Sequence, residues 1–123
     1  MVMSLDSRLV FRSAVDPVAL TELIGNAPAD FAGLVLLCER DFPGAVASLR
    51  AALLAQDADM ADRSAHSLKG MLRNLCAEAG GELAEQIGLM AREGRFAEAE
   101  PRVAELEVEL GLVVGEIRAL SAG

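Results

Sequence analysis

The chain has 123 residues, which is enough for one domain with a substantial core and too short for two ordinary ones. Hydrophobic residues make up 53% of it but aromatic residues only 3%, and the abundance of Ala, Leu and Glu predicts an all-α fold. The net charge of −8 at pH 7 would repel a phosphate backbone, which argues against nucleic acid as a partner.

The first predicted helix follows a short tail. Residues 1–14 show no sustained hydrophobic period and are expected to form a tail that is at most partly helical, ahead of one domain over residues 15–121. Asp16 and Pro17 indicate a helix start, because a capping carboxylate precedes a proline at the first helical position. The short helix that follows should end at Gly25-Asn26.

The second predicted helix begins at Pro28 or Asp30. Apolar side chains continue at helical spacing to the region of Gln56-Asp57, where this element should end. Pro43-Gly44 interrupts the pattern, but the apolar stripe resumes directly after it. The interruption therefore predicts a kink or a brief break within one element rather than a domain boundary.

The third predicted helix contains His66, the only histidine of the chain. Asp57 or Asp59 should cap this helix, which should run to about Ala77. Its apolar residues repeat at three- and four-residue steps, the period of one helix face, at positions 61, 65, 68, 72 and 75. His66 lies well off the axis of that stripe, so the pattern places the imidazole away from the core.

Two further helices complete the predicted fold. Gly80-Gly81 should end the third helix, Glu82 should begin the fourth, and Gly94 should end it. The last helix carries a seam of apolar residues at alternating steps of three and four: Phe96, Ala99, Val103, Leu106, Leu110, Val113, Ile117 and Leu120. Pro101 cannot donate to the helical ladder, so we expect a regular start at or just before residue 101.

Helices of this kind can bury their apolar faces in two ways. A seam of this length is compatible with a coiled-coil dimer. Four long amphipathic helices joined by short loops more often pack within one chain. We therefore predict a monomeric, antiparallel up-down four-helix bundle with a short additional N-terminal helix.

The sequence argues against a membrane segment and against a metal site. The longest apolar run, Phe31 to Cys38, has eight residues, whereas a spanning helix needs about 20. Cys38 and Cys76 are far apart without a CxxC spacing, which favours two buried thiols in a reducing cytoplasm. One histidine and two scattered cysteines make no zinc site. We expect a cytoplasmic protein without a membrane partner.

The candidate site is the flank of the third helix that carries His66. Lys69, Gly70 and Arg73 fall on the same flank, about one and two turns further along. Glycine inside a helix costs about 1 kcal/mol relative to alanine, so Gly70 indicates a need for space beside the imidazole. The flank thus combines a nucleophilic ring, two cations and room for the backbone of a second protein.

These groups suit covalent phosphoryl chemistry. A neutral imidazole nitrogen is a nucleophile near pH 7 and can form covalent intermediates. Phosphoryl transfer depends mostly on positioning and on stabilising charge on the equatorial oxygens. The chain has no GxxxxGK[ST] loop, no kinase-type glycine loop and no carboxylate set suited to magnesium. We therefore expect no bound cofactor and no transfer from ATP by this chain alone, and whether it counts as an enzyme stays open.

The segment AHSLKG at residues 65–70, followed by NLCA at residues 74–77, resembles the signature of histidine-containing phosphotransfer (HPt) domains. The likeness extends over most of the chain. Residues 42–57 resemble the helix that precedes the signature, and residues 83–120 resemble the closing antiparallel pair. HPt domains carry phosphate between aspartates of response-regulator receiver domains, and the resemblance implies a four-helix up-down bundle with that function.

The resemblance also implies roles by position. His66 matches the phospho-accepting histidine, and Lys69 matches the lysine that steadies the phosphoryl oxygens. Arg73 stands where many members have a small residue, and this long cation is either a second phosphate-binding group or an obstacle to the receiver. A receiver would dock on the exposed residues of this flank, namely Gly70, Asp62 and Ser67.

Orientation of the imidazole is the other point at which this chain departs from the family. Several members place a glutamine or glutamate on the next helix to hold the second ring nitrogen, and that position is Gly88 here. Gln86 or Glu85, or a water molecule, would then have to orient the ring.

The function implied by the resemblance is that of a phosphorelay intermediate. His66 would accept a phosphoryl group from an aspartyl-phosphate of one receiver domain and pass it to an aspartate of another. The partners would be receiver domains and a sensor or hybrid histidine kinase, with magnesium on the receiver and no metal on this chain. One alternative is a non-transferring helical adaptor that binds or sequesters a receiver or kinase domain. Another is an enzyme with His66 as general base, for which the sequence shows no arranged nucleophile or oxyanion donors.

Overall fold

The computed structural model describes residues 13–122, and these contain helices and loops without any strand. The helices are α2 (Pro17–Ile24), α3 (Pro28–Leu54), α4 (Ala58–Asn74), α5 (Glu78–Arg92) and α6 (Phe96–Ser121). The predicted all-α class is therefore confirmed for the described part of the chain. Residues 1–12 of the predicted tail lie outside the described residues.

Local sequence signals determine several helix ends. Asp16 and Asp57 are the N-caps of α2 and α4, and each side chain accepts a backbone N–H at 3.0 Å. Gly25 and Gly94 follow α2 and α5 with φ angles of 92° and 74°, a left-handed conformation that glycine adopts without steric cost. The predicted ends at Gly25 and Gly94 are confirmed.

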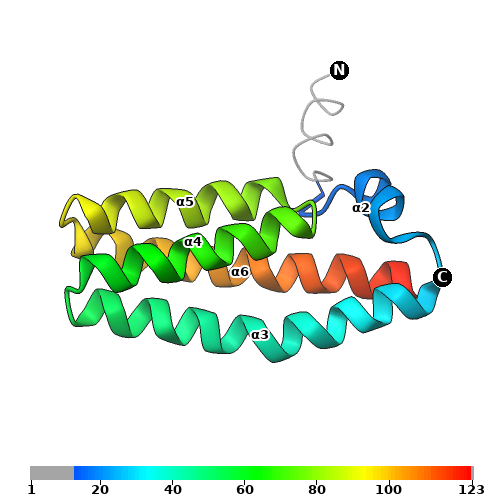
Figure 1. Ribbon diagram of the computed structural model, residues 1–123, viewed down its shortest axis with the longest axis horizontal. Coiled ribbons are helices and arrows are strands. Elements are labelled where there is room, and N and C mark those ends of the chain that lie inside the picture. Colours follow the sequence, from blue (N-terminus) through cyan, green and yellow to red (C-terminus); the bar gives the residue numbers. More distant parts are fainter. Residues whose placement is uncertain (1–12, 123) are drawn as a thin grey trace, which may run out of the picture.

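Of the two outcomes predicted at Pro43-Gly44, a kink or a brief break, the break does not occur, because α3 runs without interruption through Pro43. The helix bends near its middle, in agreement with the predicted kink (Figure 1). Phe42 and Val46 lie on either side of Pro43 along the chain, and both are buried, whereas Pro43 itself is exposed. Burial of the apolar row therefore holds the helix together across the hydrogen bond that proline cannot make.

The boundary between the third and fourth long elements also differs from the prediction. α4 ends at Asn74, Cys76 adopts a positive φ of 58° in the turn, and α5 begins at Glu78. The prediction that Gly80-Gly81 ends α4 and Glu82 begins the next helix is therefore wrong, because both glycines lie inside α5.

The two glycines are explained by their contacts with α4. A Cβ atom on Gly80 would lie 3.2 Å from Cδ2 of Leu72, and one on Gly81 would lie 3.3 Å from Cγ of Arg73. Both residues are buried. The missing side chains let α5 approach α4 closely, and this packing outweighs the low helix propensity of glycine.

The start of α6 is a further correction. The helix begins at Phe96, ahead of Pro101, and not at or just before residue 101 as predicted. Ala99 and Val103 are fully buried on the core side, and Pro101 is exposed on the outside. One missing ladder hydrogen bond on the solvent side is thus tolerated because the apolar seam is continuous on the other side.

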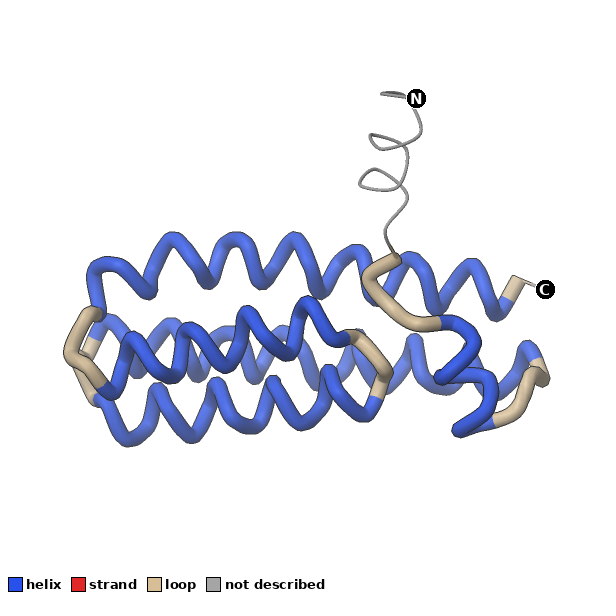
Figure 2. The backbone as a smooth tube through the Cα atoms, turned by 90° about the horizontal axis from the view of Figure 1, so that it is seen from above, coloured by secondary structure: helices blue, strands red, loops and turns tan. Residues whose placement is uncertain are grey.

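The four long helices lie side by side, and α2 lies across one end of the group (Figure 1). α4 contacts α3 and α5, and α6 contacts α3 and α5. The chain reverses direction between successive long helices in Figure 1. The α3–α4 and α5–α6 loops lie together at one end of the molecule, and the α4–α5 loop lies short of the other end (Figure 2). The pair α4–α5 and the pair α3–α6 therefore form opposite sides of the four-helix group.

The interior consists of apolar, mostly aliphatic side chains from every helix, with no buried polar or charged residue among residues 13–122. The largest fully buried side chains include Leu20, Leu49, Leu68, Ile87 and Leu106. The segment before α2 is held to the far end of the chain, because the carboxylate of Glu116 accepts the backbone N–H groups of Ala14 and Val15 at 2.8 and 2.9 Å.

No helix within residues 13–122 is by itself long and apolar enough to cross a membrane. α2 and α3 reach that length and composition only as a pair, and the two helices are bent by 104° at their junction.

Candidate functional site

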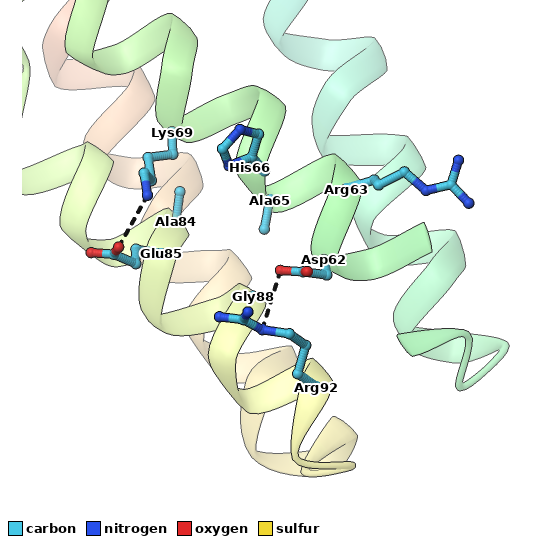
Figure 3. A pocket seen from close by; sticks show the side chains of 9 residues that line it. All are labelled: Asp62, Arg63, Ala65, His66, Lys69, Ala84, Glu85, Gly88 and Arg92. Carbon is cyan, nitrogen blue, oxygen red and sulfur yellow. Dashed lines mark hydrogen bonds and ion pairs between the residues drawn. The ribbon is translucent and has the colours of Figure 1, made fainter. Parts of the chain in front are cut away.

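α4 presents His66 to solvent because the apolar stripe of this helix points the other way. The predicted stripe is buried in full: Ala61, Ala65, Leu68, Leu72 and Leu75. His66 and Ser67 are exposed, as the helical period requires for residues off that stripe. Figure 3 shows the imidazole on the outer side of α4, above the groove that separates this helix from α5.

A cavity of about 390 Å³ opens beside the imidazole, between α4 and α5. α4 contributes Asp62, Arg63, Ala65, His66 and Lys69, and α5 contributes Ala84, Glu85, Gly88 and Arg92. The small residues at its floor, Ala65, Ala84 and Gly88, leave space that charged side chains border (Figure 3). Imidazole and cations therefore face one open space that a small anionic group can enter.

Lys69 is the cation most firmly placed in this cavity. Its Nζ donates a hydrogen bond to Oε2 of Glu85 at 3.0 Å, and its side chain is only 20% exposed. The hydrogen bond from Lys69 and the charges of Lys69, Arg73 and Arg92 hold the pKa of Glu85 below its usual value. Glu85 is thus a charged counter-ion of Lys69 in the free protein.

Arg73 lies one turn beyond Lys69 and is shared between two carboxylates. Its Nη2 is 3.9 Å from Oε1 of Glu85, and its Nε is 3.7 Å from Oε1 of Glu78. Arg73 does not line the cavity at His66. The structure therefore places Arg73 at the edge of the site, linked to it through Glu85.

Arg92 is a site residue that sequence reasoning missed. It extends from the last turn of α5 toward α4, and its Nε lies 3.5 Å from Oδ1 of Asp62 (Figure 3). Only the pairing of α4 with α5 brings it beside the cavity, so no local pattern around His66 could have indicated it. Arg63 also borders the cavity, and its side chain points away from the imidazole (Figure 3).

Gly70 leaves the surface beside His66 open. A Cβ atom at this position would meet nothing within 4 Å, and the residue is exposed. Neither packing nor backbone conformation within residues 13–122 requires glycine here, in contrast to Gly80 and Gly81. Asp62 is half-buried on the opposite side of the imidazole and bound by Arg92.

The two residues suggested to orient the imidazole have other partners. Glu85 binds Lys69, and Gln86 accepts a hydrogen bond from Arg102 on α6. Among the described residues, neither ring nitrogen of His66 has a hydrogen-bond partner. Gly88 is buried, and a Cβ atom on it would lie 3.0 Å from Oδ1 of Asp62 and 3.3 Å from Cβ of Ala65. A larger side chain here would therefore require Asp62 and Ala65 to shift by a few tenths of an ångström.

The chemistry available to this site is that of a nucleophile with flanking cations. Within residues 13–122 there is no cluster of three or more His, Cys, Asp or Glu side chains that could hold a metal ion. An exposed imidazole can attack an electrophile brought by a second molecule. Lys69 and Arg92 border the space where an anion on that ring would sit, and they can stabilise its charge.

Comparison with known proteins gave one finding. The family model described as the Hpt domain matches residues 33–120, which include every residue of the cavity. No curated protein and no solved structure matches the chain.

Proposed function

The chain belongs to the Hpt domain family, and from this membership we propose that His66 is its phospho-accepting residue. Hpt domains take part in two-component phosphorelays and interact with receiver domains and histidine kinases, so phosphotransfer signalling is the process in which this chain acts. The observation that supports His66 is its exposure on α4 beside a cavity lined by cations.

The proposed transfer has two steps of the same kind. A neutral nitrogen of His66 attacks the phosphorus of an aspartyl-phosphate on a receiver domain, a P–N bond forms, and the P–O bond to the aspartate breaks and leaves a carboxylate. A carboxylate of another receiver then attacks the same phosphorus and releases the imidazole. Magnesium belongs to the receiver in both steps.

Lys69 is the proposed stabiliser of the phosphoryl oxygens, and Arg73 an auxiliary cation. Support comes from the position of Lys69 in the cavity wall, one turn from His66. In the free protein Lys69 is bound to Glu85, so an incoming phosphoryl group competes with that carboxylate for the ammonium. Asp62, Ser67 and Gly70 lie around the imidazole and are proposed to contact the docked receiver.

The decisive experiment follows radiolabelled phosphate from a phosphorylated receiver domain to this protein. Wild type should acquire an acid-labile label, and His66→Gln should acquire none. Comparable labelling of His66→Gln would contradict the assignment. Circular dichroism of the variant provides the control, because an exposed histidine should be replaceable without loss of helix.

A non-transferring adaptor is the second candidate, and one observation favours it. Neither ring nitrogen of His66 has a hydrogen-bond partner among residues 13–122, and the position that often supplies one in the family is Gly88. An adaptor would bind a receiver domain in a pull-down or by calorimetry without ever becoming labelled. Gly70→Trp tests receiver docking, which both candidate functions require. A bulky side chain on this open surface should weaken receiver binding while leaving the fold intact.

We extend the same proposal to the architecture and the compartment. The helices α3 to α6 form the antiparallel up-down bundle of the family, which the reversal of direction between successive helices in Figure 1 supports. A cytoplasmic location is supported by two free thiols, Cys38 and Cys76, in a protein proposed to meet receiver domains.

A further inference from the structure

The carboxylate of Glu85 faces two cations of α4 through its two different oxygens. Oε2 accepts a hydrogen bond from Nζ of Lys69 at 3.0 Å (Figure 3), and Oε1 lies 3.9 Å from Nη2 of Arg73. Lys69 and Arg73 are four residues apart, which makes them neighbours on one side of the helix. Because the two cations use separate oxygens, Glu85 can release one of them and keep the other.

Arg73 lies along α5 rather than over the imidazole. A Cβ atom on Gly81 would lie 3.3 Å from Cγ and 3.6 Å from Nε of Arg73, so the absence of a side chain at Gly81 gives the arginine stem its place. In addition, Nε of Arg73 is 3.7 Å from Oε1 of Glu78. Packing and charge therefore both direct this guanidinium toward carboxylates of α5.

Lys69 is placed differently from Arg73. Its side chain lines the cavity beside the imidazole and is 20% exposed, whereas Arg73 lies outside the cavity and is 46% exposed. Arg92, which also borders the cavity, is paired with Asp62 at 3.5 Å. Of these three cations, Arg73 is thus the one that contacts Glu85 from outside the space that a phosphoryl group would enter.

A phosphoryl group on His66 would change the balance of charge around Glu85. It would add negative charge to the cavity that Glu85 also lines. If Lys69 turns to the phosphoryl oxygens, Glu85 loses its hydrogen-bond donor and meets a like charge. A cation that stays with Glu85 offsets that loss, so it makes the exchange of Lys69 easier.

Arg73 already acts on Glu85 in the free protein. The pKa of Glu85 is below its usual value, mainly because Lys69 donates a hydrogen bond to it and adds its charge, and Arg73 adds a further positive charge. Sharing the carboxylate in this way also weakens its hold on Lys69, since charge that is neutralised by one cation attracts the other less.

We propose that Arg73 is a positioning residue that acts through Glu85. It keeps the carboxylate while Lys69 moves to a phosphoryl group on His66, and so makes the ammonium available there. The inference rests on the proposed phosphorylation of His66, and it assigns to Arg73 no contact with the phosphoryl group. Removal of Arg73 should therefore tighten the Lys69–Glu85 pair and slow phosphorylation.

The first measurement uses the free protein and does not depend on phosphoryl transfer. NMR titration of the Glu85 side chain should show a higher midpoint in Arg73→Ala than in wild type, because the carboxylate loses a nearby positive charge. Arg95→Ala is the matched control and should leave this midpoint unchanged. Arg95 is 47% exposed and is also shared between two carboxylates, those of Glu93 and Glu98. A midpoint that Arg73→Ala does not raise would overturn the proposal.

The second measurement follows phosphorylation of the full chain by phosphoramidate, so that docking of a receiver plays no part. The neutral imidazole of His66 attacks phosphorus, a P–N bond to the ring forms, and the protonated amine of the donor leaves as ammonia when its own P–N bond breaks. Phosphorus NMR measures the rate. Arg73→Ala should be phosphorylated about two- to fivefold more slowly than wild type, the size expected for one partly exposed ion pair.

A double-mutant cycle with Glu85→Gln separates an action through Glu85 from direct contact with the phosphoryl group. Glutamine keeps the size of the side chain but removes the charge that Lys69 and Arg73 share. In the Glu85→Gln background, the effect of Arg73→Ala on the rate should therefore disappear. Equal slowing in both backgrounds would overturn the proposal in favour of direct phosphate binding by Arg73. Equal rates for Arg73→Ala and wild type would overturn it outright.

The same experiment distinguishes failure of this inference from failure of the proposed function. If wild type accepts no phosphoryl group from phosphoramidate or from a receiver, His66 is not a phospho-acceptor and both proposals are wrong. If wild type is phosphorylated and His66→Gln is not, the proposed function stands, and the Arg73 variants alone decide the role of Arg73.

Discussion

Lys69 shows how a single residue is prepared for a charged partner in this site. Its side chain is largely covered, one turn from His66, and its ammonium is already bound to a carboxylate. Phosphorylation of His66 would add negative charge to the same cavity. The balance between Glu85 and the phosphoryl group for this one cation is therefore central to the proposed transfer.

Lys69→Ala should slow phosphoryl transfer to His66 by about tenfold to a hundredfold, because the cation stabilises charge that develops on the phosphoryl oxygens. The free energy of unfolding should change by less than about 1 kcal/mol, since the Lys69–Glu85 pair is partly exposed and such pairs contribute little. Single-turnover labelling from a phosphorylated receiver measures the rate, and urea denaturation measures the stability. An unchanged rate would contradict the role proposed for Lys69.

Glu85 should titrate at a lower pH than an ordinary glutamate, because Lys69 donates to it and three cations surround it. Because the pKa of Glu85 is lower in the folded state, the Lys69–Glu85 pair contributes its full stabilisation of the fold above the pKa of glutamate in the unfolded chain, about 4.3. That contribution is lost as the pH falls through the lower, folded pKa. NMR titration of the Glu85 side chain should show this midpoint, and Lys69→Ala should raise it toward the usual value. A midpoint that does not respond to Lys69→Ala would show that the ion pair is absent in solution.

At the scale of helices, the contact between α4 and α5 depends on small residues. Gly80, Gly81 and Gly88 all face α4, and each has atoms of that helix within 3.3 Å of where a Cβ would lie. The cavity at His66 exists because the two backbones run close together below the charged side chains. Glycine here is a packing residue inside a helix, not a signal for the end of one.

Gly88→Gln places a long side chain in the close contact between α5 and α4, and we expect it to destabilise this protein by about 1–3 kcal/mol. Its Cβ would lie 3.0 Å from Asp62 and 3.3 Å from Ala65, so both neighbours must shift by a few tenths of an ångström. Gly70→Ala is the matched control. It has no neighbour within 4 Å and should stabilise α4 by about 0.5–1 kcal/mol. Urea denaturation compares the variants, and a neutral Gly88→Gln would mean that the helices separate easily.

For the molecule as a whole, Glu116 connects the two ends of the described chain. Its carboxylate on α6 accepts two backbone N–H groups from the segment before α2. Ala14 and Val15, the donors, are buried residues, so removing the carboxylate would leave two partly covered N–H groups without their acceptor. The position of α2 at the end of the bundle is held in part by this contact.

Glu116→Ala should therefore lower the free energy of unfolding by about 1–3 kcal/mol, because two buried N–H groups lose a charged acceptor. Glu105→Ala is the control, since Glu105 is an exposed residue of the same helix that pairs with Arg102 and should contribute less than about 1 kcal/mol. Thermal denaturation at one protein concentration measures both. Equal effects of the two substitutions would contradict the anchoring role of Glu116.

Features that depend on local periodicity could be predicted from the order of the residues alone. The all-α class, the buried stripe of α4 and the exposure of His66 all follow from the helical repeat, because a residue's face in a helix is decided by its spacing from its neighbours. The caps at Asp16 and Asp57 follow from side-chain chemistry within one turn.

Features that depend on which helices meet were set by the packing of the folded chain. Gly80-Gly81 and Pro101 look like helix ends in the sequence, yet they lie inside α5 and α6, because burial against neighbouring helices outweighs their local preferences. Arg92 reaches the site only because α5 packs on α4. A local pattern carries no information about contacts between residues far apart in the chain, and those contacts complete the site around His66.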